Sequence, residues 1–254
     1  MRSLLRLAGM LAVALIALQL FFLLRVVLMR FVTPESTTFQ RSEIWRLVVD
    51  RHELPWLQEP VARERISDNL RRAVIASEDA GFTEHHGVEW DAVEGAWNKN
   101  QRAEARAQAQ QERLAGATKR NPTARSRVVV AKVVGGSTIS QQLAKNLFLS
   151  GERTVLRKAQ ELVITMMLEL VLGKERILTA YLNNVEWGEG VFGAQAAAEH
   201  YFHTDAARLA PGQAARLAVM LPAPKRFEKT PSSPYVMGRS ATIAARMGAV
   251  DLPD

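Results

Sequence analysis

An uncharged apolar run near the start of the chain, from Leu7 to Leu24, constrains the fold more than any other feature. The run is 18 residues long, and its one polar side chain is Gln19. A helix of about 17–25 apolar residues can span a bilayer. A secretory signal has an apolar region of only about 7–15 residues before a small-residue cleavage site, whereas RVVLMRFV follows here. We therefore expect an uncleaved transmembrane anchor over residues 1–32.

The charges around this run do not orient it. Arg2 and Arg6 precede it, and Arg25 and Arg30 follow it, so the excess of positive charge that marks a cytoplasmic flank is nearly balanced. A buried helix of a soluble protein is the alternative reading of the run. After the anchor we expect a juxtamembrane connector over residues 33–59 and a single domain over residues 60–245, since 254 residues with 48% hydrophobic residues can bury a real core.

The net charge of +7 belongs to one stretch. Residues 99–132 hold nine Lys or Arg against Glu104 and Glu112, and the rest of the chain balances. We interpret about 99–130 as a basic insert. A plain basic surface is one alternative, and an anchored protein that binds nucleic acid is another. The second lacks the aromatic residues between basic ones, and any recognised motif, that nucleic-acid binding would bring, so no nucleic-acid partner is predicted. The chain has no Cys, which excludes disulfides and thiolate chemistry.

Helical periodicity dominates the remainder and predicts a mainly α fold. Apolar residues recur at helical spacing over about 60–76, 138–149, 153–172 and 174–184, and GVFGAQAAAEHYF reads as a helix of small residues. Pro211 fits the first turn of a further helix, which Pro222 and Pro224 would end. RVVVAKVV at 127–134 is the one convincing strand candidate.

Ionisable residues crowd into SEDAGFTEHHGVEWD, residues 77–91. Glu78 here and Glu161 further on form a pair of carboxylates on separate elements, a pattern typical of sugar chemistry. Their separation decides the reaction, and spacing in sequence does not give it. His85 and His86 do not favour a metal site, because neighbouring side chains seldom point the same way and no third ligand is spaced nearby.

A second motif, GGSTISQQLAKN, places polar side chains on one wall of a helix. At about 100° per residue Thr138, Gln141, Gln142 and Lys145 fall together, and Ile139, Leu143 and Leu147 fall on the adjoining wall. Gly136 lets the backbone enter the helix tightly, and Ser137 is a suitable N-cap. Any amphipathic helix has a polar face, but amides, a hydroxyl and one cation suit sugar hydroxyls beside an anion.

A third region places Arg153, Arg157 and Glu161 at four-residue intervals along one helix face. The alternative to a functional site is an ordinary surface pair between Arg157 and Glu161, worth about 0.3–0.5 kcal/mol. The apolar stretch LVITMML after Glu161 makes partial burial of that carboxylate an expectation.

Together these motifs resemble the peptidoglycan glycosyltransferases (glycosyltransferase family 51). IASEDAGFTEHHG is similar to the family's first motif, GGSTISQQLAKN to its second, RKAQE to its third, KERILTAYLNNVEWGEGVFGAQAAAEHYF to its fourth and LAPGQAARLAVMLPAP to its fifth. The resemblance covers about residues 60–240 in the family's order, and five ordered motifs are specific. Because the chain ends at residue 254, without room for a transpeptidase domain, we expect a monofunctional biosynthetic member.

The resemblance implies a lysozyme-like, mainly α glycosyltransferase domain on one N-terminal transmembrane helix. The domain would lie on the periplasmic side of the bacterial inner membrane and polymerise lipid II into glycan strands, with inversion at the sugar C1 and release of undecaprenyl pyrophosphate. Lipid II, the growing glycan strand and membrane lipids are the expected partners; contacts with other cell-wall synthesis and division proteins are left open. The rival is a membrane-bound lytic transglycosylase or muramidase-like enzyme, which needs no cations for a pyrophosphate.

The resemblance also implies a role for each residue that matches a position of the family's motifs. Glu78 matches the general base, and Glu161 the second carboxylate on the pyrophosphate side; a divalent cation (Mg²⁺ or Mn²⁺) held through Glu161 is left open. Lys145 and Arg153 match the cations that would hold the leaving pyrophosphate. The remaining matched positions are substrate or pyrophosphate contacts (Asp79, Ser137, Thr138, Gln141, Gln142, Asn183) and scaffold residues of the motifs (Phe82, His85, Gly87, Gly136).

The chain departs from the family's pattern inside the first motif. Ala80 and Gly81 stand where a basic residue is common, and Val88 and Glu89 stand where an Asp is usual. These differences leave Glu78 in place and put the local support of the motif in question.

Overall fold

The computed structural model describes residues 2–90, 94–95, 101–103, 105–111, 136–152 and 154–253. The chain forms two compact units, one of residues 1–87 with 138–254 and the other of residues 88–137. In the second unit residues 101–103 and 105–111, at the start of the basic insert, are helical and mostly exposed. The predicted strand at 127–134 lies outside the described residues.

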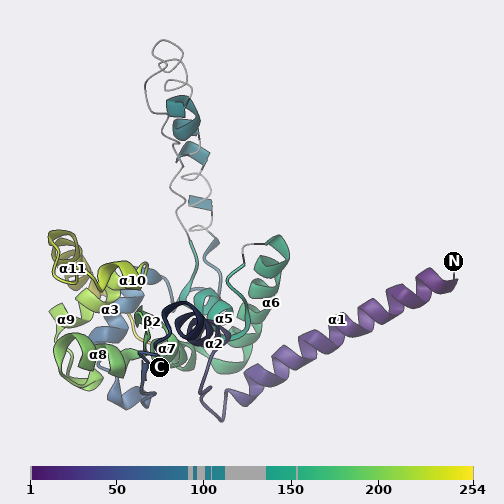
Figure 1. Cartoon of the computed structure of the whole chain (residues 1–254), viewed down its shortest axis with the longest axis horizontal. Coiled ribbons are helices and arrows are strands. Elements are labelled where there is room, and N and C mark those ends of the chain that lie inside the picture. The colour runs from purple at the N-terminus through teal and green to yellow at the C-terminus, as the bar shows by residue number, and fades with distance from the viewer. Residues whose placement is uncertain are drawn as a thin grey trace. The chain divides into compact units, whose positions relative to one another are not determined.

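Helix α1 (Arg2–Leu28) is, in the described part of the chain, the one helix long and apolar enough to cross a membrane. Most of its large apolar side chains are exposed, and only Phe22 and Val26 of the helix are buried. They lie near its C-terminal end, where α1 packs against α6 (Val155–Leu172). Gln19 and Gln160 exchange hydrogen bonds of 2.9 and 3.0 Å there. The helix is consistent with the predicted single-pass anchor, and its end is built into the first unit (Figure 1).

Two helices occupy much of the predicted connector. Helix α2 (Thr38–Arg46) starts with a capping box between Thr37 and Gln40, and the helix η1 (Leu47–Arg51) continues it. Thr37 and Gln40 are buried, and the Thr38 hydroxyl donates to the carbonyl of Leu147 at 2.9 Å. The segment therefore folds onto α5 (Ile139–Phe148). A domain boundary near residue 60 stays a prediction.

The core of the first unit is helical, which confirms the predicted mainly α class (Figure 1). Helix α3 packs against α9 and α11, while α5 packs against α6 and α7. Their bounds are α3 Asp68–Glu78, α5 Ile139–Phe148, α7 Lys174–Asn184, α8 Ala194–Phe202, α9 Pro211–Met220, α10 Pro224–Phe227 and α11 Pro234–Arg246, with short turns η2 Arg63–Arg65, η3 Ala206–Arg208 and η4 Met247–Ala249. The helices predicted over 138–149 and 174–184 are confirmed within one residue at each end. Pro211 begins α9 as predicted, and Pro224 begins α10.

A small sheet was not predicted. Strands β1 (Leu57–Gln58), β2 (Glu186–Gly188) and β3 (Val191–Phe192) lie in the order β1-β3-β2, with β1 parallel and β2 antiparallel to β3. Strands of two or three residues are too short to show an alternating pattern. Gly190 makes the β2–β3 turn possible, because its φ is +76° and a Cβ would lie 1.7 Å from the carbonyl oxygen of Pro55.

Candidate active site

Helix α3 presents Glu78 at its last residue. Ser67 caps the helix by accepting a hydrogen bond from the Asn69 N–H at 3.1 Å, so α3 begins at Asp68 rather than near residue 60 as predicted. At the other end it extends through Glu78, about two residues beyond the predicted helix. Leu70, Val74 and Ile75 bury the inner face of the helix.

The Glu78 carboxylate is held by neutral partners. Its Oε2 accepts a hydrogen bond from the Gln142 amide at 3.1 Å, and Oε1 lies 3.4 Å from the Ser77 hydroxyl. The Tyr181 hydroxyl in turn donates to Gln142 Oε1 at 3.0 Å, which fixes the amide with its nitrogen towards Glu78. Burial raises the pKa of Glu78, and the negative charge of Asp79 adds a smaller rise, against the two hydrogen bonds.

The Asp79 carboxylate bonds to neighbouring groups of the protein rather than facing an open site. Its side chain is fully buried, and Oδ2 accepts a hydrogen bond from the backbone N–H of Ile139 at 2.9 Å. Oδ1 lies 2.8 Å from His85 Nε2; because the Gly87 N–H donates to His85 Nδ1, the ring proton sits on Nε2 and is donated to Asp79. Asp79 thus ties the first motif to the N-terminus of α5, and its predicted contact with substrate stays a prediction.

The predicted scaffold residues of the first motif have packing that fits that role. Phe82 is fully buried, with the Lys174 ammonium 4.5 Å from the centre of its ring. Gly87 has φ +88°, and a Cβ there would lie 2.8 Å from Thr165 Cγ2. Only glycine fits this point without a shift of α6. Gly136 belongs to the second unit, residues 88–137.

The N-cap of α5 is Thr138, so the prediction of Ser137 as the cap is wrong. The Thr138 hydroxyl accepts from the Gln141 N–H at 3.2 Å, and Gln141 Oε1 accepts from the Thr138 N–H at 3.3 Å, which completes a capping box. The same hydroxyl donates to the carbonyl of Gly87 at 2.6 Å. That second bond explains why the cap is one residue later than predicted.

This cap divides the polar wall predicted for α5. Thr138 and Gln141 are buried and bonded to each other, whereas Gln142 reaches Glu78 and Lys145 is exposed. The contact between Gln142 and Glu78 was not predicted from the sequence. Substrate contacts of Ser137, Thr138, Gln141, Gln142 and Lys145 stay predictions.

Glu161 lies on α6 with its side chain 3% exposed. Its Oε2 accepts from the Arg157 guanidinium at 2.7 Å, and Oε1 bonds with the Lys158 ammonium. The predicted ion pair between Arg157 and Glu161 is therefore present, but its carboxylate is buried and does not lie on the surface. Arg153 lies outside the described residues.

These contacts do not fit a divalent cation at Glu161. Both carboxylate oxygens are bonded to cationic side chains, and among the described residues no group of three His, Asp or Glu is placed to hold a metal. We route no chemical step through a metal ion. The amide of Asn183 is also occupied: it bonds to both backbone groups of Val61, at 3.0 and 2.9 Å, and so secures the segment before α3. Its predicted role in binding is untested.

Sequence reasoning missed Tyr181, Lys158 and a buried acid, Glu186. Burial raises the pKa of Glu186 to about 7, although Lys225 lies 3.3 Å away and opposes the rise. Lys225 also bonds to Glu43 of α2. An acid between two apolar residues in VEW was the available signal for Glu186. Tyr181 was recognisable only as an apolar position of α7.

Comparison with known proteins identifies the family. The transglycosylase family matches residues 51–118 and 111–248. A biosynthetic peptidoglycan transglycosylase of Cupriavidus metallidurans is 49% identical over 100% of both chains. Proteins of the same description from Paraburkholderia xenovorans and Bordetella pertussis are 46% and 48% identical over 98% and 92% of this chain, and 92% and 88% of their own lengths. The chain therefore belongs to the family of biosynthetic peptidoglycan transglycosylases, which are glycosyltransferases.

Proposed function

We propose that the protein polymerises lipid II into glycan strands at the inner membrane, with Glu78 as the general base. The observation that carries this proposal is the environment of Glu78: a carboxylate at a helix end, with a raised pKa and bonded by an amide and a hydroxyl but by no cation among the described residues. A base with a pKa nearer to neutral pH transfers protons more effectively. Membership of the family supports the assignment of the reaction.

In this mechanism Glu78 takes the proton from the 4-hydroxyl of the acceptor GlcNAc as its oxygen attacks C1 of the donor MurNAc. The bond from C1 to the pyrophosphate oxygen breaks, C1 inverts, and undecaprenyl pyrophosphate leaves with the bonding electron pair. Negative charge grows on the leaving group, so cations beside it lower the barrier. Lys145 and Arg153 are proposed for that role, on the resemblance of their positions.

The anchor would determine where in the cell the reaction takes place. Helix α1 would hold the domain on the periplasmic face, where a lipid-linked donor stays in the membrane while the glycan extends. The basic insert would lie near anionic headgroups, with about 1 kcal/mol of attraction for each Lys or Arg close to the surface. Divisome or other cell-wall partners remain open.

The test is to incubate detergent-purified protein with labelled lipid II and separate the products by length. We expect polymer from the wild type and a loss of about 10²–10⁴-fold for Glu78→Gln, with Glu84→Gln as the matched control because Glu84 is an exposed acid of the same motif. Undiminished polymer from Glu78→Gln would remove Glu78 as base. Shortening of added glycan without polymer formation would instead identify the lytic rival.

A further inference from the structure

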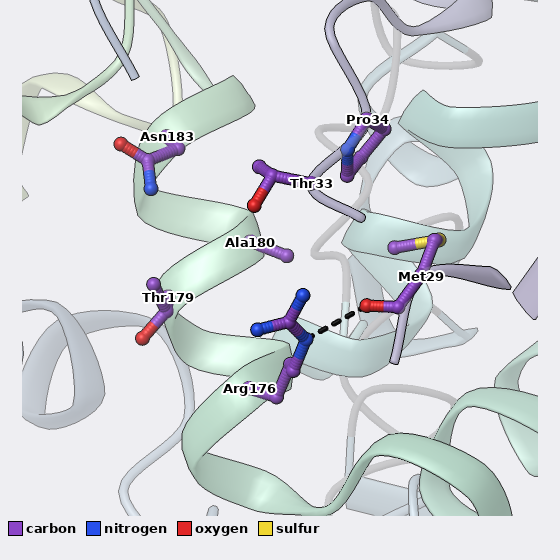
Figure 2. A pocket seen from close by; sticks show the side chains of 7 residues that line it. All are labelled: Met29, Thr33, Pro34, Arg176, Thr179, Ala180 and Asn183. Carbon is purple, nitrogen blue, oxygen red and sulfur yellow. Dashed lines mark hydrogen bonds between the residues drawn. The ribbon is translucent and has the colours of Figure 1, made fainter. Parts of the chain in front are cut away.

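A small pocket lies where the end of the membrane helix meets α7. Its lining comes from the segment after α1 (Met29, Thr33 and Pro34) and from one face of α7, which includes Arg176 and Thr179 (Figure 2). The pocket holds about 20 Å³ and opens to solvent, which is room for roughly one oxygen-sized group in its depth. A ligand would therefore insert one polar atom and keep its bulk outside.

Arg176 supplies the charge of this pocket. Its Nε donates to the carbonyl of Met29 at 2.7 Å and so ties α7 to the residue after α1. An arginine that caps the end of a helix is common, but this bond uses one of its five N–H donors. Within the described ranges Arg176 forms no ion pair and no other side-chain hydrogen bond. Its two terminal nitrogens turn away from Met29, on the side of Thr33 and Thr179 (Figure 2).

The pocket faces away from the catalytic groups. With 3.6 residues per turn, Arg176, Thr179 and Asn183 fall within about 60° of one another on α7, and Tyr181 falls roughly 170° from their middle. Tyr181 is the residue that bonds to Gln142 beside Glu78. The two faces of α7 thus serve different surroundings, one the base and the other the end of the anchor.

We propose that this pocket binds the phosphate of a membrane phospholipid. Helix α1 is the candidate membrane span and ends at Leu28, so Met29 and Thr33 lie where such a helix leaves the hydrocarbon and lipid phosphates begin. A guanidinium with free donors forms strong, charge-assisted hydrogen bonds to phosphate, and Thr33 and Thr179 line the same pocket. Arg25 in the last turn of the helix adds attraction for an anionic headgroup.

Native mass spectrometry of the full chain in a phosphate-free maltoside detergent tests the site. Phosphatidylglycerol is titrated into the wild type, into Arg176→Gln and into Arg30→Gln, a matched control that loses the same charge from an exposed side chain near the pocket. We expect one tightly retained lipid in the wild type, about tenfold weaker retention in Arg176→Gln, and a change within about twofold in Arg30→Gln. Equal retention by wild type and Arg176→Gln would overturn the proposal.

Two further arms identify the source of the phosphate. Diacylglycerol, which has the same tails and no phosphate, should not occupy the site; equal retention would show apolar binding and overturn the proposal. Inorganic phosphate at millimolar concentration should not displace the lipid; displacement would assign the pocket to a free anion. If thermal unfolding shows that Arg176→Gln does not fold, the double variant Thr33→Val/Thr179→Val takes its place, with a severalfold weaker retention expected and an unchanged one contradicting the site.

Discussion

The two candidate carboxylates, Glu78 and Glu161, have opposite surroundings. Glu78 ends α3 among an amide, a hydroxyl and buried apolar residues, and burial raises its pKa. Glu161 lies within α6 and forms ion pairs with Arg157 and Lys158, so two neighbouring cations compensate its negative charge. The comparison separates two uses of an acid: one kept ready to take a proton, and one that organises cations along a helix.

This difference explains how one domain can hold both groups. A desolvated carboxyl without a cation lowers stability when it ionises, whereas removal of a buried carboxylate between two cations leaves those cations without a charge partner. Catalytic groups are commonly of the first kind, because the environment that tunes them for chemistry is unfavourable for folding. Glu78 and Glu161 should therefore respond to the same substitution with opposite changes in stability.

The largest effect we predict is on the free energy of unfolding of Glu161→Gln. The variant leaves the Arg157 guanidinium, whose side chain is 16% exposed, without its charge partner. Loss of one partner of a buried pair destabilises by about 3 kcal/mol, and half-exposed Lys158 adds little. Denaturant unfolding of the detergent-solubilised chain measures this. Arg208→Gln, which breaks an exposed pair with Asp205, is the control and should leave stability close to that of the wild type.

The same measurement on Glu78→Gln should give a gain at neutral pH. An acid whose pKa is raised in the folded chain contributes its full stability below the unfolded pKa and loses it as pH rises through the folded value. Because Gln does not ionise, the variant avoids this loss, and its advantage over wild type should shrink as the pH falls towards 4. A loss of stability in Glu78→Gln, equal at both pH values, would break the comparison.

The next effect concerns the pH dependence of polymerisation in Gln142→Met. Without the amide, Glu78 loses the hydrogen bond that favours its ionised form. That bond then no longer opposes the rise in the pKa of Glu78 that burial causes. The pKa of Glu78 then rises further, so the acid limb of kcat/KM moves to higher pH. A hydrogen bond to a charged group contributes about 1.5 kcal/mol, so we expect about tenfold lower activity on the acid limb of the profile. An acid limb that stays in place would show that Gln142 does not act on the base.

The sequence alone predicted the helices better than it predicted the tertiary contacts between them. The bounds of α7 were predictable because KERILTAYLNN is periodic and follows Gly173. Helical periodicity also placed Gln142 on the polar wall of α5. That this wall meets the end of α3 depends on tertiary packing between residues 64 positions apart, which periodicity does not contain.

The errors have similar causes. Ser137 and Thr138 are both good caps by residue type, and the choice fell to Thr138 because its hydroxyl also reaches the Gly87 carbonyl, a long-range contact. The pair of Arg157 and Glu161 was predictable from spacing. The burial that makes it strong was not, because α6 alone does not show which face α5 covers. The β1–β3 pairing joins segments more than 130 positions apart.

The smallest effect we predict separates positioning from proton transfer, through Tyr181→Phe. Burial raises the pKa of Tyr181 well above its ordinary value, so its hydroxyl stays protonated and donates to Gln142 Oε1. Without it Gln142 is free to turn its amide, and the hydrogen bond to Glu78 is made only part of the time. We expect a fall of about threefold to tenfold in kcat/KM, since a neutral hydrogen bond contributes about 1 kcal/mol. The acid limb should move in the same direction as in Gln142→Met but less, and in the double variant the Tyr181 change should add nothing. Fully additive effects would mean that Tyr181 acts on the reaction by a route other than Gln142, and the contrast between a tuned Glu78 and a charge-balanced Glu161 would then rest on burial alone.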